Sequence, residues 1–521
     1  MPIPRRRFLG LALSGALAPF ARRAAAAPRT VGALDAHHAT RNTLLGSLGA
    51  GSLWSSQPLP HKRYTGFARE PLGAAHLASR PLAAVVPALE PATSFVPEPL
   101  PREQLAALLR FTNGVTAQLV GTDPPVYRRA APSAGALYAG EVYVVAEQVK
   151  GLAPGLYAYQ PLEDALVPLR QGRQLRRVAA ALESPGTLEH AAAAVLLTNV
   201  FPRYAWKYGQ RGYRYALIDS GHIGENLRLA AAGAGLGVAS PLRFHDDALN
   251  ELLGQDGKRE AVCALHALGQ PSEWGDPSEP GPRLVENSRA EAVRDESLPP
   301  ALRYHEGTKL VPLAGEEAAP PPEPAPRASG AKPALALPTL ETAPERNVTD
   351  CIWKRRSALR FSSGALALWE LAFVLEMAQG AAAAANSELE VRLVVHRVEG
   401  LAPGLYRFLP EAHGLERLEA GSLAGPLERA CLYQDKAASA AVAFLVVGEL
   451  AAARARAGER SYRDLLLGAG ALAERIYLAA EAIDLGARNL AAFFDDPLNE
   501  LAKVDGRERA VVHLTVLGRE A

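Results

Sequence analysis

The chain has 521 residues, of which 48% are hydrophobic and 21% are charged, and its formal net charge is +1. This length exceeds what one hydrophobic core usually serves, so we expect two or three globular domains. The even charge balance is not that of a nucleic-acid-binding protein, and the hydrophobic content excludes a largely disordered chain. The three cysteines, Cys263, Cys351 and Cys431, have no metal-ligand spacing, so we expect buried free thiols and no metal site.

The first 27 residues are typical of a twin-arginine export signal. Arg5–Arg7 precede a short apolar run that ends at Phe20, and Ala24–Ala26 provide a small-residue cleavage site. The run is too short to span a bilayer as a helix, and no other stretch reaches the roughly 18 apolar residues that a span requires. We therefore expect export to the periplasm and no integral membrane span after signal removal. A signal anchor or a chance basic start is the alternative.

The next 250 or so residues read as mixed helix and strand. Glu141–Ala146 is a β-branched run that predicts a strand, and Gly151–Tyr157 predicts a turn. Ile218–Ala232 has a helical period, and Ala261–Leu268 predicts a closing strand. Strands separated by long helices predict an α+β sandwich rather than an all-helical array.

Two polar segments of this region are candidates for chemistry. Pro132-Ser133-Ala134-Gly135 is a turn in which backbone amides and a hydroxyl approach a planar ligand closely, although the same residues occur in any tight turn. Further along, Lys207 and Tyr208 lie in a stretch rich in basic and phenolic groups. Such a pair serves as general base and acid when its neighbours move the pKa values toward neutrality; a surface loop is the alternative.

The second half of the chain repeats the first. Gly151–Tyr157 recurs unchanged as Gly400–Tyr406, a displacement of 249 residues, and the leader Ala33–Arg41 resembles Ala301–Lys309. The same displacement aligns identical residues further on: Arg211, Tyr213 and Arg214 with Arg460, Tyr462 and Arg463, Gly237 with Gly486, Asp246–Asp247 with Asp495–Asp496, and Asn250 with Asn499. A chance repeat does not keep its register over this length, so we infer a tandem duplication.

The duplication predicts the domain boundaries. A signal over residues 1–27 precedes a first domain over 28–285, and a second domain covers 346–521. Between them, residues 286–345 hold the leader of the second copy and a Pro/Ala-rich linker. The second copy repeats the predicted strand at Glu390–Val395, the helix at Leu465–Ala482 and the closing strand at Ala510–Leu517.

A basic segment is found in the second copy alone. Arg355, Arg356, Ser357 and Arg360 place three guanidinium groups and a hydroxyl just ahead of a predicted helix over Leu366–Met377. Arginine forks and a hydroxyl near a helix start suit a phosphate dianion, whereas a charge run by itself is usually a solvated face.

Together, the RRSxR, PSAGALY, WKYG and RGYRY motifs make the chain similar to the SagB/ThcOx branch of the nitroreductase flavoproteins. The resemblance implies an α+β fold that dimerises closely with FMN between subunits. It implies that Arg355, Arg356, Ser357 and Arg360 bind the FMN phosphate from one subunit and that Pro132–Gly135 contact the flavin from the other. Arg507 and Arg509 are candidates for the same phosphate site by likeness to C-terminal basic residues of relatives, with surface charge as the alternative.

The two copies depart from the motifs in complementary ways. Leu89, Glu90, Pro91 and Ser94 of the first copy align with Arg355, Arg356, Ser357 and Arg360. Conversely, Ala381–Ala385 of the second copy align with the PSAGA turn, and Arg456-Ala457 align with Lys207-Tyr208. If the copies pair as the family's subunits do, one complete site remains and the other is lost.

These patterns predict an FMN-dependent oxidoreductase with one FMN site between the copies, in a monomer whose copies satisfy each other's interface. Members of this branch oxidise azolines in peptides to azoles, with Lys207 or Tyr208 assisting removal of a ring proton. Export favours another small-molecule or peptide substrate. The alternatives are an NAD(P)H-dependent nitro or quinone reductase and a flavin-free binding protein.

Overall fold

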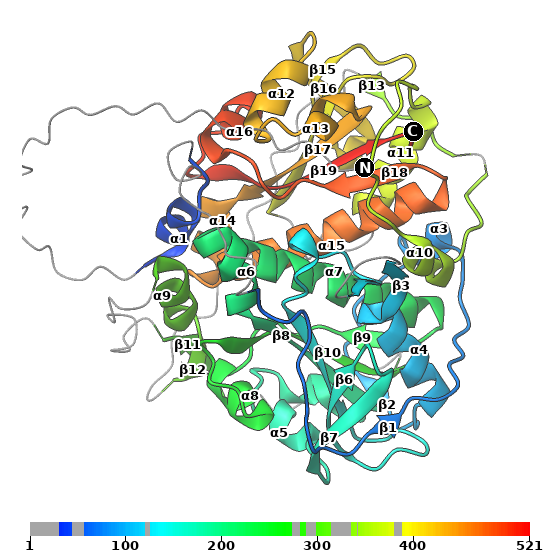
Figure 1. Ribbon diagram of the computed structural model, residues 1–521, viewed down its shortest axis with the longest axis vertical. Coiled ribbons are helices and arrows are strands. Elements are labelled where there is room, and N and C mark those ends of the chain that lie inside the picture. The colour runs from blue at the N-terminus through cyan, green and yellow to red at the C-terminus, as the bar shows by residue number, and fades with distance from the viewer. Residues whose placement is uncertain are drawn as a thin grey trace, which may run out of the picture.

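The computed structural model describes residues 31–43, 57–119, 125–272, 282–287, 299–313, 335–340, 342–379 and 388–521. They form two similar α+β units that lie against each other (Figure 1). We call residues 31–287 copy one and residues 299–521 copy two. The sheet of copy one lies in the lower part of the figure and the sheet of copy two in the upper part, while α9 (Pro300–Gly307) and β12 (Leu310–Pro312) of copy two lie beside β11 (Leu284–Glu286) of copy one. The predicted export signal, most of the predicted linker and Ala381–Ala385 lie outside the described residues.

The sheet of copy one is antiparallel throughout, in the order β1-β7-β6-β5-β8-β10-β2, with β9 also paired to β10. Its strands are β1 (Glu70–Pro71), β2 (Phe95–Val96), β5 (Gly140–Ala146), β6 (Gly155–Gln160), β7 (Ala165–Gln171), β8 (Ala193–Val200), β9 (Gly237–Ala239) and β10 (Glu260–Pro271). Strand β5 is buried along its whole length. Its nearly continuous apolar sequence follows from having both faces covered.

Copy two repeats this topology as β13-β16-β15-β14-β17-β19-β18. The strands are β13 (Leu335–Ala336), β14 (Leu389–Val395), β15 (Gly404–Leu409), β16 (Gly414–Ala420), β17 (Val442–Glu449), β18 (Gly486–Asn489) and β19 (Arg509–Gly518). Two separate hairpins pair β3 (Val115–Leu119) with β4 (Val126–Arg129) and β11 (Leu284–Glu286) with β12 (Leu310–Pro312). The predicted α+β class, the tandem repeat and the four predicted strands are confirmed.

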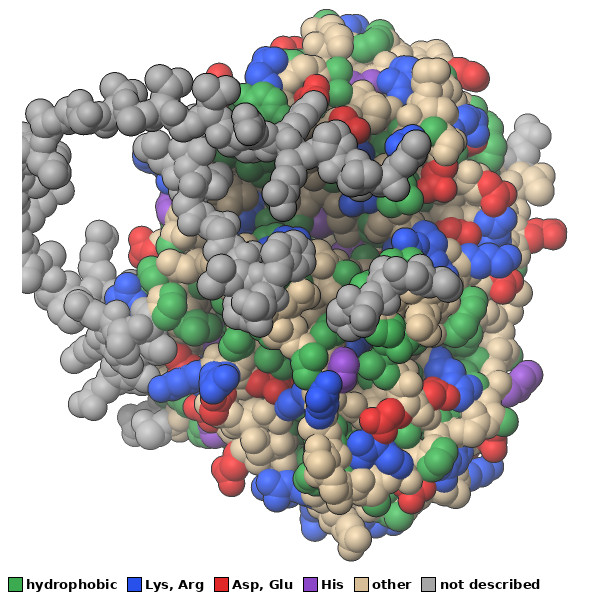
Figure 2. All heavy atoms as spheres, in the orientation of Figure 1, with side chains coloured by type: hydrophobic (Ala, Val, Ile, Leu, Met, Phe, Trp, Pro, Cys, Tyr) green, Lys and Arg blue, Asp and Glu red, His purple; other side chains and the backbone are tan. Residues whose placement is uncertain are grey.

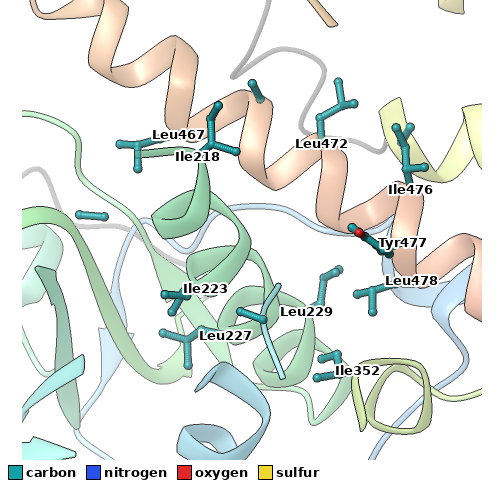
Figure 3. Packing of buried hydrophobic residues seen from close by; sticks show 14 of the residues in the cluster. Ile218, Ile223, Leu227, Leu229, Ile352, Leu467, Leu472, Ile476, Tyr477 and Leu478 are labelled. Carbon is teal, nitrogen blue, oxygen red and sulfur yellow. The ribbon is translucent and has the colours of Figure 1, made fainter. Parts of the chain in front are cut away.

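Two long helices, α7 (Gly212–Gly233) and α15 (Ser461–Ala482), cross where the copies meet (Figures 1 and 3). Both are buried almost all round, as expected of helices in the middle of a large core. A Cβ on Gly221 would overlap the carbonyl oxygen of Leu467, and a Cβ on Gly470 would overlap that of Ile218. Glycine at these two positions therefore permits the backbones to touch.

The remaining helices surround this centre. Copy one contains α1 (Ala33–Ala39), α3 (Leu82–Val85), α4 (Arg102–Asn113), α5 (Leu175–Ala179), α6 (Phe201–Tyr208) and α8 (Asp246–Leu253). Copy two contains α9 (Pro300–Gly307), α10 (Val348–Lys354), α11 (Leu368–Gln379), α12 (Ala424–Ala430), α13 (Asp435–Ser439), α14 (Leu450–Ala457) and α16 (Asp495–Leu501). Among the described residues, no helix is long and apolar enough to cross a membrane.

The hydrophobic residues form one shared core and two outer cores. The shared core joins both copies through α7 and α15, and its members include Ile218 of α7 and Leu472 and Ile476 of α15 (Figure 3). One outer core covers the other face of each sheet. Cys263, Cys351 and Cys431 are buried and free, as expected. Because the largest core belongs to both copies, we infer that they fold as one unit.

Buried ion pairs repeat across the interface. Asp495 of copy two accepts hydrogen bonds from Arg211 and Arg214 of copy one, at 2.5 and 2.6 Å. Asp246 of copy one pairs in the same way with Arg460 and Arg463 of copy two, at 2.8 and 2.9 Å. This reciprocity is that of a two-fold symmetric dimer formed within one chain. It also explains why α7 begins at Gly212, ahead of the predicted Ile218: the basic RGYRY segment is buried by its partners.

Candidate active site between the two copies

The predicted turn of copy one lies beside the predicted lysine and tyrosine. Gly135 has a positive φ of 62° inside the short 3-10 helix over Ala134–Ala136. A Cβ at Gly135 would lie 3.1 Å from Lys207 Nζ and would overlap Tyr208 Oη. Only glycine therefore permits the turn to touch both side chains. The structure brings these three sequence-predicted residues together.

The turn is strained. Ala136 and Tyr138 also have positive φ values, of 55° and 46°, and such conformations cost roughly 1–2 kcal/mol for residues other than glycine. Pro132, Ser133 and Ala134 are half-buried beside them. Residues in sparsely populated conformations persist only where their surroundings hold them in place.

Lys207 and Tyr208 are the last two residues of α6. The Lys207 side chain is exposed, and its ammonium lies 5.3 Å from the Tyr208 ring centroid. Burial, then the neighbouring Tyr215 and Asp219, raises the pKa of Tyr208. The expectation that its neighbours bring the Tyr208 pKa toward neutrality is therefore wrong, because desolvation and negative charge both disfavour the phenolate. Tyr208 keeps its proton at neutral pH and is suited to donate a hydrogen bond.

Arg355 of copy two reaches the same turn from the other side. Its Nε donates to the carbonyl oxygen of Ala130 at 2.9 Å, and its Nη2 to that of Arg129 at 3.4 Å, just ahead of Pro132. The guanidinium also lies 5.1 Å from the Tyr477 ring centroid. Its remaining nitrogen, Nη1, is buried without a hydrogen-bond partner among the described residues. A buried free donor of this kind is suited to an anionic ligand.

Arg356 and Ser357 lie next to it. Arg356 Nη2 donates to the carbonyl oxygen of Thr116 in copy one at 3.3 Å, and Ser357 Oγ is 2.9 Å from Tyr477 Oη. Burial, then the positive charges of Arg355 and Arg128, lowers the pKa of Arg356. Three cations from both copies are thus crowded together, an arrangement that a bound anion stabilises. The sequence reasoning missed Arg128, whose basic pair with Arg129 was the available signal.

The expected helix start does not contribute to this cluster. Arg355 follows α10 as its C-terminal cap residue, and the next long helix, α11, begins only at Leu368. The segment between them is held by backbone pairing of Ser357 with Ala487, at the edge of the sheet of copy two. The Arg360 side chain is exposed. Side-chain and backbone donors, rather than a helix dipole, define this site.

Arg507 and Arg509 do not join the cluster, so that expectation is wrong. Arg509 begins β19 and is paired with Glu449 and Glu390, at 2.6 and 2.9 Å. Ser357 pairs with β18 beside the opposite end of β19, where Ala487 faces Leu517. Arg507 is exposed and lines a surface pocket with His38 and Arg41. The extended strand separates these arginines from the cation cluster.

The equivalent place in the other half of the molecule is built differently. Pro81 of copy one pairs with Asn347 of copy two across the pseudo-two-fold axis, so these two residues are equivalent. Leu89 follows Pro81 at the same spacing as Arg355 follows Asn347, and Leu89 is therefore the counterpart of Arg355. Leu89 is buried in the shared core, 4% exposed. Arg228 takes the place of Tyr477 on the facing helix and forms an ion pair with Glu225 at 2.7 Å. An apolar side chain thus replaces the cation of the other half.

Three histidines, His37, His222 and His305, are buried and hydrogen-bonded. His37 Nδ1 lies 3.0 Å from Tyr462 Oη, His305 Nδ1 lies 3.1 Å from Tyr213 Oη, and His222 Nδ1 lies 2.9 Å from Glu474 Oε2. Over the described part of the chain, no group of His, Cys, Asp and Glu side chains is arranged to hold a metal ion.

Comparison with known proteins agrees with this architecture. The model of the nitroreductase family matches residues 94–270 and 352–519, once in each copy and over more than half of the chain. The crystal structure of a nitroreductase from Anabaena variabilis ATCC 29413 superposes with a TM-score of 0.73 at 25% identity. That match covers 94% of this chain and 99% of the other, so the similarity includes both copies.

Two curated relatives match parts of the chain. MJ1384 of Methanocaldococcus jannaschii, described as a nitroreductase, is 28% identical over 180 residues, which are 33% of this chain and 89% of that protein. The microcin B17-processing protein McbC of Escherichia coli is 34% identical over 153 residues, or 28% of this chain, and that match spans only 56% of McbC. With the family model matched twice and the fold of both copies shared with a known structure, this chain belongs to the nitroreductase family.

Proposed function

We propose that the chain is an FMN-dependent dehydrogenase of the SagB/ThcOx type, with one FMN site between its two copies. One observation carries the proposal: Arg355 of copy two donates hydrogen bonds to the backbone immediately ahead of the Pro132–Gly135 turn of copy one. Copy two, which alone has the basic segment, therefore contacts copy one, which alone has the turn and the Lys207-Tyr208 pair.

The residues fit FMN in charge and in shape. Arg355, Arg356 and Ser357 would bind the phosphate, since the buried Nη1 of Arg355 is a free donor and the positive charges of Arg355 and Arg128 both lower the pKa of Arg356. The Pro132–Gly135 turn would lie against the isoalloxazine, because its glycine leaves room for close backbone approach. FMN, when bound, supplies the acceptor for a hydride from the substrate.

Lys207 and Tyr208 have different tasks in this proposal. Tyr208 keeps its proton, so it donates a hydrogen bond that orients the substrate. Lys207 is exposed beside it and, as the neutral amine, would accept a ring proton from an azoline-like substrate while the hydride passes to the flavin. The similarity to McbC supports this substrate class, whereas export of the chain would favour a different small molecule or peptide.

The first experiment measures the cofactor after expression in the cytoplasm. We expect one FMN per chain, and we expect a peptide azoline to bleach the flavin absorbance when added without oxygen. Two FMN per chain would contradict the single composite site. Colourless protein that does not take up FMN would favour a flavin-free binding protein.

A second candidate function is an NAD(P)H-dependent nitro or quinone reductase, which the descriptions of the Anabaena and Methanocaldococcus proteins favour. Oxidation of NADH or NADPH with a nitroaromatic acceptor separates the two. We expect slower flavin reduction by NAD(P)H than by the azoline, and the reverse order would select the reductase.

Three further features remain proposals. We propose that the chain works as a monomer because its copies bury each other's interface. The segment 1–27 would direct export to the periplasm, leaving residues 28–285 and 346–521 as the two domains. Sedimentation of the purified protein, and cell fractionation of the Arg5→Lys/Arg6→Lys variant, test the first two. Limited proteolysis within residues 286–345 tests the domain boundaries.

A further inference from the structure

One face of α7 holds two buried polar side chains that the proposed function does not use. Asp219 and His222 are three residues apart, so they lie on the same side of the helix. Asp219 is 6% exposed and His222 is 1% exposed. Burying such groups is unfavourable unless they have hydrogen-bond partners, so their partners indicate what they do.

Asp219 holds the strained turn of copy one. Its Oδ2 accepts hydrogen bonds from the backbone N–H of Ala134, at 3.2 Å, and from the hydroxyl of Tyr204. Tyr204 Oη lies 2.7 Å from Ser133 Oγ, which in turn accepts the N–H of Tyr138 at 2.9 Å. Both ends of the turn are thus connected to one carboxylate. This explains how residues with unfavourable φ values keep their positions.

His222 reaches into copy two, toward the phosphate-binding residues. Its Nε2 accepts a hydrogen bond from Asn489 Nδ2 at 3.0 Å, and the backbone N–H of Asn489 donates to Tyr477 Oη at 2.8 Å. Tyr477 Oη is the partner of Ser357 Oγ, and Arg355 lies over the same ring. One helix of copy one is therefore hydrogen-bonded to both halves of the candidate site.

The duplication supplies an internal control for this relationship. In copy two, the positions 249 residues after Asp219 and His222 are Gly468 and Ala471. Those after Tyr204 and Ser133 are Ala453 and Ala382. By contrast, Arg211 and Arg214 of the same helix, whose ion pairs join the copies, have counterparts in Arg460 and Arg463. Residues that hold the copies together are thus present twice, whereas Asp219, His222, Tyr204 and Ser133 have no like counterpart in copy two.

We propose that Asp219 and His222 are positioning residues that keep the flavin-facing turn of copy one and the phosphate-binding segment of copy two in register. This inference rests on the proposed FMN site. Neither residue touches the reacting atoms in this proposal. Each acts through a neighbour, Asp219 through Tyr204 and Ser133, and His222 through Asn489 and Tyr477.

The surroundings of Asp219 make its contribution depend on pH. Burial raises the Asp219 pKa to about 7. The facing titratable groups are Tyr204 and Tyr208 of α6, Tyr138 of the turn and Glu474 of α15, and burial raises the pKa of each, that of Glu474 to about 8. As the pH falls from about 8 to about 6, Asp219 goes from largely ionised to largely protonated, and Glu474 loses its remaining charge over the same range. The protonated form of Asp219 is the poorer acceptor for two hydrogen bonds on one oxygen.

The test measures FMN affinity by flavin fluorescence between about pH 6 and pH 8, on either side of that pKa. For the full-length protein we expect the affinity to fall several-fold as Asp219 protonates. The Asp219→Asn variant, which keeps an acceptor but has no charge, should bind FMN more weakly and should show a smaller difference in affinity between pH 8 and pH 6 than the unaltered protein. Titration of the FMN phosphate contributes equally to both proteins, so the difference between them reports Asp219.

Histidine variants test the second half of the proposal. We expect His222→Leu to weaken FMN binding about tenfold, the usual scale for one buried hydrogen bond, and His222→Gln to restore part of it. His305→Leu is the matched control, because His305 is equally buried and bonded to Tyr213 but lies outside the site. It should lower the melting temperature and leave FMN affinity unchanged.

The outcomes separate the inference from the function on which it rests. An unaltered chain that binds no FMN overturns the proposed function, and this inference with it. An unaltered chain that binds FMN, with Asp219→Asn and His222→Leu showing the same affinity and pH profile, overturns the inference alone. The inference also fails if His305→Leu and His222→Leu weaken FMN binding to the same degree, because the role of His222 would then be purely structural.

Discussion

Arg355 donates from Nε to the carbonyl oxygen of Ala130, so a side chain of copy two reaches the backbone of copy one two residues ahead of the Pro132–Gly135 turn. The counterpart of Arg355 in copy one is the buried Leu89. The duplicated chain has thus kept the cation on one side of its pseudo-two-fold axis and an apolar residue on the other.

Replacing Arg355 by leucine gives copy two the residue that copy one has at the equivalent position. We expect FMN binding to weaken at least tenfold, because a charge-assisted hydrogen bond to the phosphate contributes roughly 1.5–3 kcal/mol. Equilibrium dialysis with FMN measures the effect. Arg507→Ala is the control, since Arg507 is exposed and lies just before β19, at the end of that strand that is remote from Arg355 and Arg356. Equal losses in both variants would contradict the assigned phosphate site.

Gly135→Ala places a methyl group against Tyr208 Oη. We expect the substitution to displace Tyr208 or the turn and to reduce turnover of the azoline substrate by an order of magnitude or more. Gly172→Ala is a matched control, because Gly172 has a φ of +80° but no atom within 4 Å of its Cβ position. Both variants should lose about 1 kcal/mol of stability from backbone strain. If both also lost turnover equally, contact with Tyr208 would not matter.

Asp495 predicts how the protein responds to acid. Despite the opposing effect of burial, Arg214 and Arg211 lower the Asp495 pKa to about 2. A carboxyl with a lowered pKa stabilises the fold above its unfolded pKa of about 3.9, and this stability is lost as the pH falls toward 2. Thermal unfolding followed by circular dichroism should therefore show a melting temperature that drops between about pH 4 and pH 2.

The Asp495→Asn variant checks this assignment at neutral pH. It should lose about 3–5 kcal/mol, because two buried arginines are left without their carboxylate. The neighbouring Asp496 is an instructive control: its side chain is 65% exposed and pairs with Arg41 at the surface. Asp496→Asn should cost less than about 1 kcal/mol. A similar loss in both variants would mean that the interface ion pairs contribute no more than surface charge does.

Gly221→Ala tests the contact between α7 and α15. Alanine is normally better than glycine inside a helix by about 1 kcal/mol, so a gain in stability is the default expectation. Here the added methyl group overlaps the carbonyl oxygen of Leu467, and we expect a loss of roughly 1–3 kcal/mol instead. Gly233→Ala, at the end of the same helix, meets nothing closer than 3.7 Å and should be neutral or stabilising. Urea titration measures both, and a stabilised Gly221→Ala variant would refute the close crossing.

The face shown in Figure 2 has no large region of one charge among its described residues. Figure 2 shows acidic and basic side chains interspersed over the part of this face that is not grey, in keeping with the formal net charge of +1. A nucleic-acid-binding face would instead carry a continuous patch of Lys and Arg side chains. The basic residues that do gather, Arg128, Arg355 and Arg356, face one another between the copies.

The sequence by itself determined the repeat, the α+β class and the elements around the site. These follow from local patterns: the 249-residue displacement, the β-branched runs that became β5 and β14, and the helical period of α7 and α15. The pairing of Arg355 with the turn of copy one was also within reach, because loss of complementary motifs in two copies constrains how the copies meet.

Only the tertiary structure decided which polar groups share an environment. In the sequence, Arg507 and Arg509 lie close to the end of the chain. In the structure, the ten extended residues of β19 separate these two arginines from that end, which lies near Ser357. The high pKa of Tyr208 depends on burial beside Tyr215 and Asp219, which no local pattern records. The hydrogen-bond partners of Asp219 and His222 lie 15 to 267 positions away in the sequence, and only folding brings them next to these two residues. Burial and long-range contact set the chemistry of these groups, and both are properties of the folded chain.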